Sequence, residues 1–213
     1  MRILVCFVTA LVFFGASFAQ EKVVDEETYS KAVQPATAYL QSAKYRAATT
    51  AESCRGQSCV WRTFETNVAE HDGQGNVRVY GFVETPRGME PLPEYRQIGG
   101  KVYVSKQNSG WKVEDAKTPA LPSPDRAEAK IEYRDLGIER DGFGELRVFS
   151  RTAYVRSSEN GAARQSIQIT KSWLARDGRY RKMEFYWTDS NNQTRRTVVY
   201  EFDPSIKVEP PKM

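Results

Sequence analysis

The stretch that decides the fold is residues 181–203, RKMEFYWTDSNNQTRRTVVYEFD. In 181–188, Met183, Phe185 and Trp187 alternate with polar neighbours, and 194–203 alternates in the same way. The polar segment 189–192 separates the two parts. Alternation with a period of two, bounded by turn residues, is typical of half-buried antiparallel strands. The stretch therefore predicts a β-hairpin with an unusually aromatic face.

The same alternation recurs along most of the chain. Gly99 and Gly100 lie between two such segments and are a signal for a two-residue hairpin turn. Successive strands joined by short polar turns indicate an antiparallel sheet that curls toward a barrel. The predicted strands are 45–52, 60–69, 77–84, 94–98, 101–106, 111–113, 131–136, 145–156, 166–174, 181–188 and 194–203.

Helical signals are confined to two places. Residues 25–42 carry an Ala-rich apolar stripe with helical spacing, Asp25 can cap their start, and Pro35 should kink or split them. Prolines then cluster in 118–125, which predicts a boundary between two halves near 115–125 and a short helix over 124–129.

The N-terminus predicts a secretory signal peptide. Arg2 is followed by the apolar run 3–14, which is too short to span a bilayer well, and small residues precede a cleavage point after Ala19. We expect 1–19 to be removed and 20–213 to form one domain; an uncleaved anchor helix is the alternative. Cys6 leaves with the signal and no cysteine stands at the mature start. We therefore expect a periplasmic or secreted protein without a stable membrane anchor.

Two cysteines, Cys54 and Cys59, remain after cleavage. An even count in an oxidising compartment predicts a disulfide. A redox pair or half of a metal site is the alternative, but a metal would need more ligands than these thiols and the single histidine, His71. We predict a structural disulfide, no metal and no cofactor.

The low net charge and the absence of catalytic motifs exclude several function classes. The net charge is only +4 and the basic residues are dispersed, whereas a nucleic-acid surface needs a concentrated stripe. The sequence has no nucleophile elbow, histidine-rich metal motif or phosphate loop. His71 begins a glycine-rich turn at 71–76, where we expect it to be exposed. The chain is thus predicted to bind no nucleic acid and not to be an enzyme.

Four segments in order carry a family resemblance: 43–46, 94–112, 170–184 and 200–211. Their order resembles the LolA/LppX-like superfamily of bacterial lipoprotein-localisation and lipid-carrier proteins. The resemblance implies a mainly β (α+β) fold, a strongly curved antiparallel half-barrel with short helices covering its concave face. It also implies an apolar cavity that holds a lipid or the acyl chains of a lipoprotein. Many relatives carry a lipidated N-terminal cysteine, which this chain lacks.

A half-barrel has an inner face too wide for its own side chains to fill unless helices plug it. Each CH₂ group of a ligand buried there contributes about 0.8 kcal/mol, so an acyl chain needs apolar area more than polar contacts. The alternative for each wall residue is ordinary core packed against the helices. The predicted cavity walls are Phe64, Val79, Phe149, Ile169, Trp173, Met183, Phe185, Trp187, Tyr200 and Phe202.

The sequence therefore predicts a soluble periplasmic or secreted carrier for a lipid or acyl chains, with an envelope protein as a candidate partner. The alternative function is a non-catalytic envelope interaction or scaffold protein. In that alternative the barrel is plugged by its helices and the polar rim contacts the partner.

Overall fold

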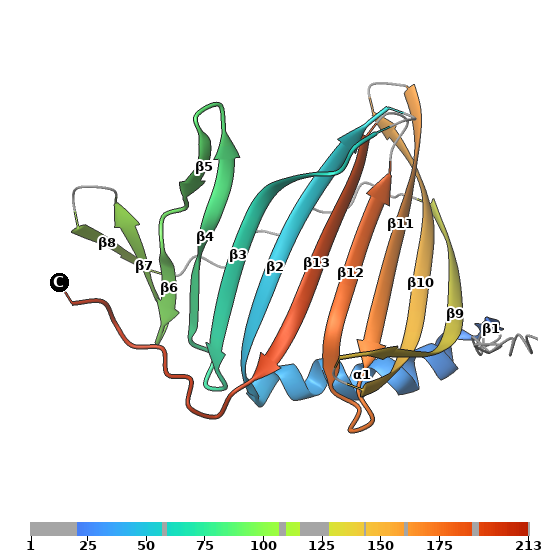
Figure 1. The fold of residues 1–213 in the computed structure, drawn as a ribbon, viewed down its shortest axis with the longest axis horizontal. Helices are drawn as coiled ribbons and strands as arrows, with labels where there is room; N and C mark the ends of the chain where they lie inside the picture. Colours follow the sequence, from blue (N-terminus) through green and yellow to red (C-terminus); the bar gives the residue numbers. More distant parts are fainter. Residues whose placement is uncertain are drawn as a thin grey trace, which may run out of the picture.

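The structure, a computed structural model, describes residues 21–56, 59–106, 110–115, 128–142, 144–159, 162–188 and 192–212. The predicted signal peptide and its cleavage point lie outside these residues, as does nearly all of the predicted boundary at 115–125. Within the described residues the chain forms one curved antiparallel sheet of thirteen strands and one α-helix (Figure 1). The predicted mainly β fold is confirmed, with one helix where short helices were expected.

Most strands are neighbours both in the sequence and in the sheet, but the last strand is central. The order is β1-β9-β10-β11-β12-β13-β2-β3-β4-β6-β7-β8, with β5 paired to β4. β13 thus joins the two halves of the chain by pairing with β2, from Asn192↔Arg55 to Phe202↔Tyr45. The strands are β1 Lys22–Val24, β2 Lys44–Arg55, β3 Arg62–Asp72, β4 Val77–Thr85, β5 Gly88–Pro91, β6 Tyr95–Ile98, β7 Lys101–Lys106, β8 Gly110–Asp115, β9 Glu128–Asp141, β10 Gly144–Glu159, β11 Ala162–Leu174, β12 Tyr180–Thr188 and β13 Asn192–Phe202.

All eleven predicted strand segments are strands in the structure, and β1 and β5 are additional. The predicted two-residue hairpin turn is confirmed as well, since Ile98 pairs with Lys101 and both intervening glycines have a positive φ. The short helix predicted over 124–129 is wrong at its end, because Glu128 and Ala129 already belong to β9. Residues 124–127 lie outside the described part.

The helix α1 spans Glu26–Ser42, and the Asp25 carboxylate caps it by accepting a hydrogen bond from the Thr28 backbone N–H at 2.7 Å. Pro35 lies inside α1, which continues past it as a single helix rather than two. Pro35 is on the exposed side of the helix, where water can solvate the carbonyl that loses its intrahelical partner. The cap was predicted correctly, whereas a split at Pro35 was not found.

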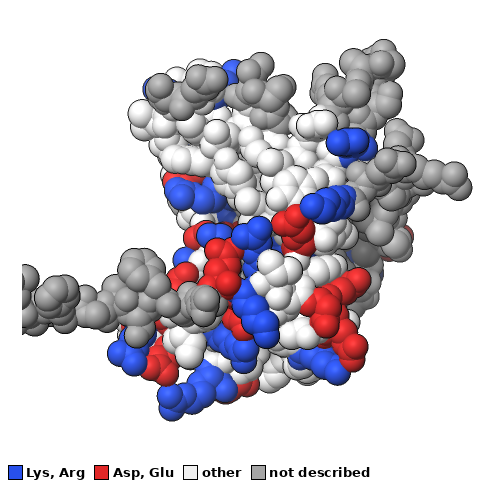
Figure 2. Space-filling model, turned by 90° about the vertical axis from the view of Figure 1, so that its right-hand side faces the viewer, with Lys and Arg blue, Asp and Glu red and all other residues white. Residues whose placement is uncertain are grey.

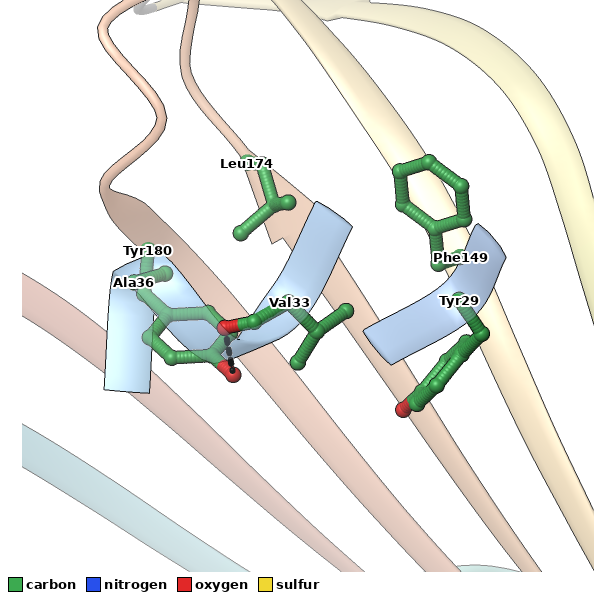
Figure 3. Packing of buried hydrophobic residues seen from close by; sticks show 6 residues of the cluster. All are labelled: Tyr29, Val33, Ala36, Phe149, Leu174 and Tyr180. Atoms are coloured by element: carbon green, nitrogen blue, oxygen red, sulfur yellow. Dashed lines mark hydrogen bonds between the residues drawn. The ribbon is translucent and has the colours of Figure 1, made fainter. Parts of the chain in front are cut away.

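α1 packs across one face of the sheet (Figures 1 and 3). Its buried residues Tyr29, Val33 and Ala36 contact Phe149 of β10, together with Leu174 and Tyr180 from β11 and β12. The Tyr180 hydroxyl also lies 2.9 Å from the Thr37 hydroxyl. This contact fixes the height of the helix above the sheet, because a buried phenol needs a polar partner.

The β3–β4 turn is held by a buried carboxylate. Asp72 is 7% exposed and accepts hydrogen bonds from the backbone N–H groups of Gln74 and Asn76, at 2.8 and 3.2 Å. The Asn76 amide donates a third, at 2.8 Å. Burial alone would raise the pKa of Asp72, but these hydrogen bonds outweigh it and the pKa lies below its usual value of 3.8.

This carboxylate gives an acid-dependent prediction. A carboxyl whose pKa is lower in the folded state stabilises fully above its unfolded pKa, and that contribution is lost as the pH falls through the folded value. Asp72→Asn should therefore lower the free energy of unfolding by about 1–2 kcal/mol at pH 7, with a smaller difference from wild type below pH ~3. Urea unfolding at both pH values measures this, and an equal difference at both would contradict it.

Candidate ligand-binding site

The site is built on the face of the sheet that carries α1, here called the helix face. Residues paired across antiparallel strands point to the same face, so the register assigns each side chain. Phe149 contacts α1 and pairs with Ser172, and the same row continues through Met183 to Val198. Every second residue from these positions along β10 to β13 therefore lies on the helix face, except across the irregular pairings noted below.

Four of the ten predicted wall residues form the core beneath or beside α1. Phe149 is 2% exposed, and Met183 and Tyr200 pack against the same cluster. Burial raises the pKa of Tyr200 to about 12. The Phe202 ring centroid lies 5.3 Å from that of Tyr39, on the helix. These four side chains contact the chain's own core, and α1 occupies the space over them.

Ile169 and Trp173 lie on the opposite face of the sheet. Trp173 is 4% exposed in a cluster with Leu146 and Val148, and its indole N–H donates to a Glu139 carboxylate oxygen at 2.7 Å. Its neighbour Ser172 shares the row of Phe149, so Trp173 must point away from α1. These two residues do not line the helix face, although both were predicted as walls.

Phe185 and Trp187 lie on the helix face and are left exposed. They follow Met183 at alternate positions of β12, and their exposed fractions are 39% and 56%. In the row of Phe185, the neighbours are Thr170 on β11 and Arg196 on β13. Two aromatic side chains on alternate positions of one strand are thus left uncovered by the described residues.

A pocket of about 390 Å³ adjoins Trp187. It brings Trp187 together with Phe64, another predicted wall residue, at the end of β12 far from α1. Phe64 reaches it because the β2–β3 pairing is irregular between Ala51 and Glu52. Val79, the last predicted wall residue, pairs with Ala69 and Tyr95 and is only half-buried. The lining residues of the pocket are Ser53, Arg55, Phe64, Trp187, Asn192 and Thr194.

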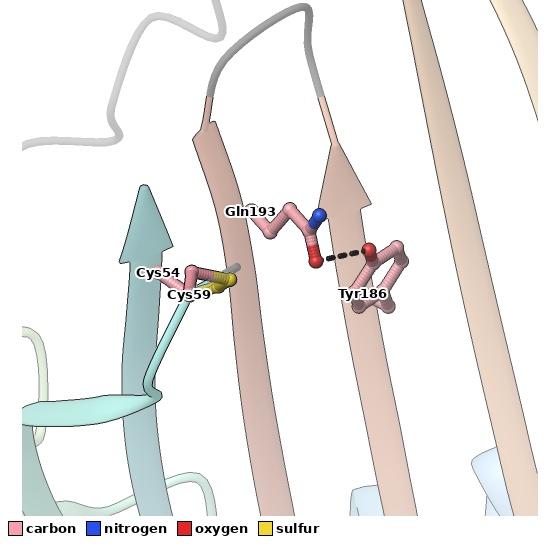
Figure 4. The surroundings of a disulfide bond; sticks show 4 residues. All are labelled: Cys54, Cys59, Tyr186 and Gln193. Carbon is pink, nitrogen blue, oxygen red and sulfur yellow. Dashed lines mark hydrogen bonds between the residues drawn. A yellow bond between two sulfur atoms is a disulfide. The ribbon is translucent and has the colours of Figure 1, made fainter. Parts of the chain in front are cut away.

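The predicted disulfide between Cys54 and Cys59 is confirmed, with 5.4 Å between the two Cα atoms (Figure 4). Cys54 lies between two residues of the pocket wall, Ser53 and Arg55. Cys54 also pairs with Gln193, whose amide oxygen accepts a hydrogen bond from the Tyr186 hydroxyl at 2.8 Å. The disulfide therefore anchors the end of β2 that carries this wall.

A larger pocket of about 780 Å³ lies along β9, β10 and β11, mainly on the opposite face. Lys130 and Glu132 on its wall form an ion pair at 2.8 Å, and the Lys130 ammonium lies 5.8 Å from the Tyr154 ring centroid. Two of its three charged groups, Lys130 and Glu132, thus neutralise each other, Arg156 being the third, and it has no exposed aromatic pair comparable with Phe185 and Trp187. We therefore place the candidate site on the helix face despite the smaller volume there.

His71 is not the exposed turn residue that the sequence suggested. It belongs to β3 and stacks on Tyr45, with ring centroids 4.3 Å apart and planes 14° apart. Burial lowers the pKa of His71, partly offset by the charge of Asp72. The imidazole is therefore a packing partner of the aromatic core at this position.

Charged side chains of both signs interleave at the end of the sheet that carries β1 and β9 (Figure 2). Glu21 and Glu132 both pair with Arg134 there, at 2.5 and 3.3 Å. Among the described residues no three His, Cys, Asp or Glu side chains come together as a metal site would require. In the same ranges, no helix is both long and apolar enough to cross a membrane.

No protein-family model and no curated protein matches the chain. Among solved structures it is similar to LprF from Mycobacterium bovis, at 9% identity and a TM-score of 0.48, over 87% of this chain and 97% of that one. It is also similar to an outer membrane lipoprotein-sorting protein domain from Vibrio parahaemolyticus (10%, 0.32, 83% and 93%). A DUF1329 family protein from Desulfovibrio piger is a third (11%, 0.29, 85% and 94%).

An open antiparallel sheet with a helix across one face is the architecture that the sequence resemblance implies, and the described residues have it.

Proposed function

We propose that this chain is a non-catalytic carrier that binds a lipid or the acyl chains of a lipoprotein. The binding site is on the helix face, in the part that α1 does not cover. The observation that carries the proposal is the exposed pair Phe185 and Trp187 on one strand of that face. Exposed aromatic side chains next to a pocket are typical of surfaces that bind apolar partners. The predicted signal peptide supports export to the periplasm or beyond, where such a carrier would act.

The energetics favour a chain-like ligand. Each methylene group removed from water contributes about 0.8 kcal/mol, so eight of them contribute about 6 kcal/mol before ordering costs. Trp187 and Phe64 border the pocket, and Phe185 extends the apolar strip toward α1. An acyl chain lying along this strip would cover both exposed rings without displacing the helix core.

The test is a binding titration with two matched variants. Native mass spectrometry of the gently purified protein should show co-purified lipid, and a fluorescent fatty-acid probe should bind saturably. The double variant Phe185→Ala/Trp187→Ala should weaken probe binding roughly 30-fold, because two partly exposed aromatic contacts are lost. Phe82→Ala is the control, since Phe82 is 50% exposed but lies on the opposite face. Equal weakening in both variants, or no saturable binding in wild type, would refute the proposal.

The plugged-barrel alternative rests on the four wall residues that α1 and its flanking core already cover. In that case the rings of Phe185 and Trp187 would contact a partner protein instead of a lipid. The same titration separates the two functions, because a plugged face gives no saturable binding of the fatty probe. Crosslinking in the envelope would then identify the partner.

A further inference from the structure

We propose that the ligand is an anionic amphiphile, an apolar chain that ends in a phosphate or carboxylate, and that Arg151 and Arg196 contact its charged group. The inference rests on the proposed function and adds the chemistry of the headgroup. It follows from the lack of an ion pair with any described residue at the arginines beside the exposed rings, whereas most arginines of the opposite face are paired.

On the opposite face, most of the described strand arginines are paired with acidic side chains, on the same strand or a neighbouring segment; Arg156 is the exception. Such pairs of opposite charge neutralise the guanidinium, so a paired arginine has a sufficient structural role. Glu70 is only 8% exposed and lies between two of these arginines. The pairs are Arg46–Glu70 at 3.0 Å, Arg78–Glu94 at 2.7 Å, Arg96–Glu94 at 2.8 Å, Arg134–Glu132 at 3.3 Å and Arg195–Glu52 at 2.8 Å.

On the helix face, Arg55, Arg151 and Arg196 have no ion pair with any described residue. Arg196 is exposed and pairs directly with Phe185 across β12 and β13. The sequence therefore places paired and unpaired arginines side by side, since Arg195 reaches Glu52 on one face while Arg196 projects beside Phe185 on the other.

The register places these cations around the apolar strip. One row runs from Arg151 through Thr170 to Phe185 and then to Arg196. With strands about 4.8 Å apart, Arg196 stands ~5 Å and Arg151 ~10 Å from Phe185, on its two sides. Arg55 lines the pocket beside Trp187. Two positive charges thus flank the middle of the strip and a third stands at its far end.

The acidic residue of this row forms no ion pair with Arg196. Glu65 lies two strands beyond it, about 10 Å away, and accepts a hydrogen bond from the Asn67 amide at 2.6 Å. A guanidinium beside an apolar strip is well placed for a charge-assisted, bidentate contact with phosphate or carboxylate. A neutral lipid would leave these charges without a partner when it covers the strip.

The experiment compares amphiphiles that share one chain and differ in the head. Dodecyl phosphate, dodecanoate, dodecylphosphocholine and dodecyltrimethylammonium are titrated into the whole mature protein below their critical micelle concentrations, and inorganic phosphate is titrated alone. We expect dodecyl phosphate and dodecanoate to bind about tenfold more tightly than dodecylphosphocholine, and this preference to shrink with added salt. The trimethylammonium probe should bind most weakly, and inorganic phosphate alone should bind far more weakly than dodecyl phosphate.

Two variants and a matched control assign the effect to the helix face. Arg196→Gln should reduce the preference roughly threefold, and Arg151→Gln/Arg196→Gln should nearly abolish it. Arg156→Gln removes an exposed arginine on the same strand as Arg151 but on the opposite face, so the preference should persist. Circular dichroism confirms that each variant is folded, and Arg196→Gln keeps the test decisive if loss of Arg151 disturbs Tyr29 nearby.

The outcomes separate this inference from the proposed function. Equal binding of all four amphiphiles, or a preference that survives in the double variant, overturns the headgroup inference and leaves the carrier function standing. Binding of inorganic phosphate as tight as that of dodecyl phosphate also overturns the inference, since the chain would then add nothing. Absence of binding for every amphiphile refutes the carrier function itself.

Discussion

Phe149→Ala is expected to lower the free energy of unfolding by about 3–5 kcal/mol, the cost of removing a buried aromatic side chain and leaving a cavity. Phe149 is 2% exposed between β10 and α1, and its ring lies edge-on to Tyr29 with centroids 6.4 Å apart. Because Phe149 packs against both elements, its loss weakens the docking of the helix as well as the sheet. Denaturant unfolding followed by circular dichroism measures the change.

The control for this prediction is Phe82→Ala, where the ring is 50% exposed. Its removal should cost less than about 1 kcal/mol, because little area is returned to water. If Phe149→Ala were as mild as Phe82→Ala, α1 could not be packed on β10 as described.

Gly73→Ala is expected to destabilise the fold by about 2–4 kcal/mol. Gly73 has a φ of 75°, where an L-residue costs about 1–2 kcal/mol. A Cβ atom there would also stand 2.5 Å from the Ser42 carbonyl oxygen, which belongs to the last residue of α1. The β3–β4 turn and the end of the helix would have to separate, and the loss of packing adds to the conformational cost.

The neighbouring Gly75 separates these two causes. Its φ is 84°, but nothing lies within 4 Å of a Cβ built on it. Gly75→Ala should therefore cost only the conformational part, about 1–2 kcal/mol. Thermal or urea unfolding of both variants measures the difference, and equal costs would show that the turn does not contact the helix.

Local patterns in the sequence predicted the strands well because the alternation of apolar and polar residues can be recognised within a single strand. Met183, Phe185 and Trp187 share one face in the structure, as the period of two predicts. Asp25 likewise marks the start of α1 through a contact only three residues away. The strands β1 and β5 have only three and four residues, and the equally short β6 was predicted where the Gly99–Gly100 hairpin signal marks its end.

The site was harder to predict because it depends on register between strands. The pairing Ser172↔Met183 decides whether Trp173 shares a face with Met183. The sequence of a single strand does not show which residue pairs with which on the neighbouring strand. Irregular pairings at Val148/Phe149 and at Ala51/Glu52 shift the faces again within single strands. Alternation predicted the exposed rings as wall candidates, but the cations beside them could be recognised only after pairing placed Arg196 next to Phe185.

The central position of β13 has a consequence for the biogenesis of the chain. β13 is synthesised after every other described strand, yet it supplies the neighbour that both β12 and β2 require. Until then the N-terminal half presents the unpaired edge of β2, the kind of edge on which chains aggregate. The two halves of the sheet therefore cannot join until β13 has been synthesised, and a chain truncated before Asn192 would leave β2 and β12 each with an unpaired edge.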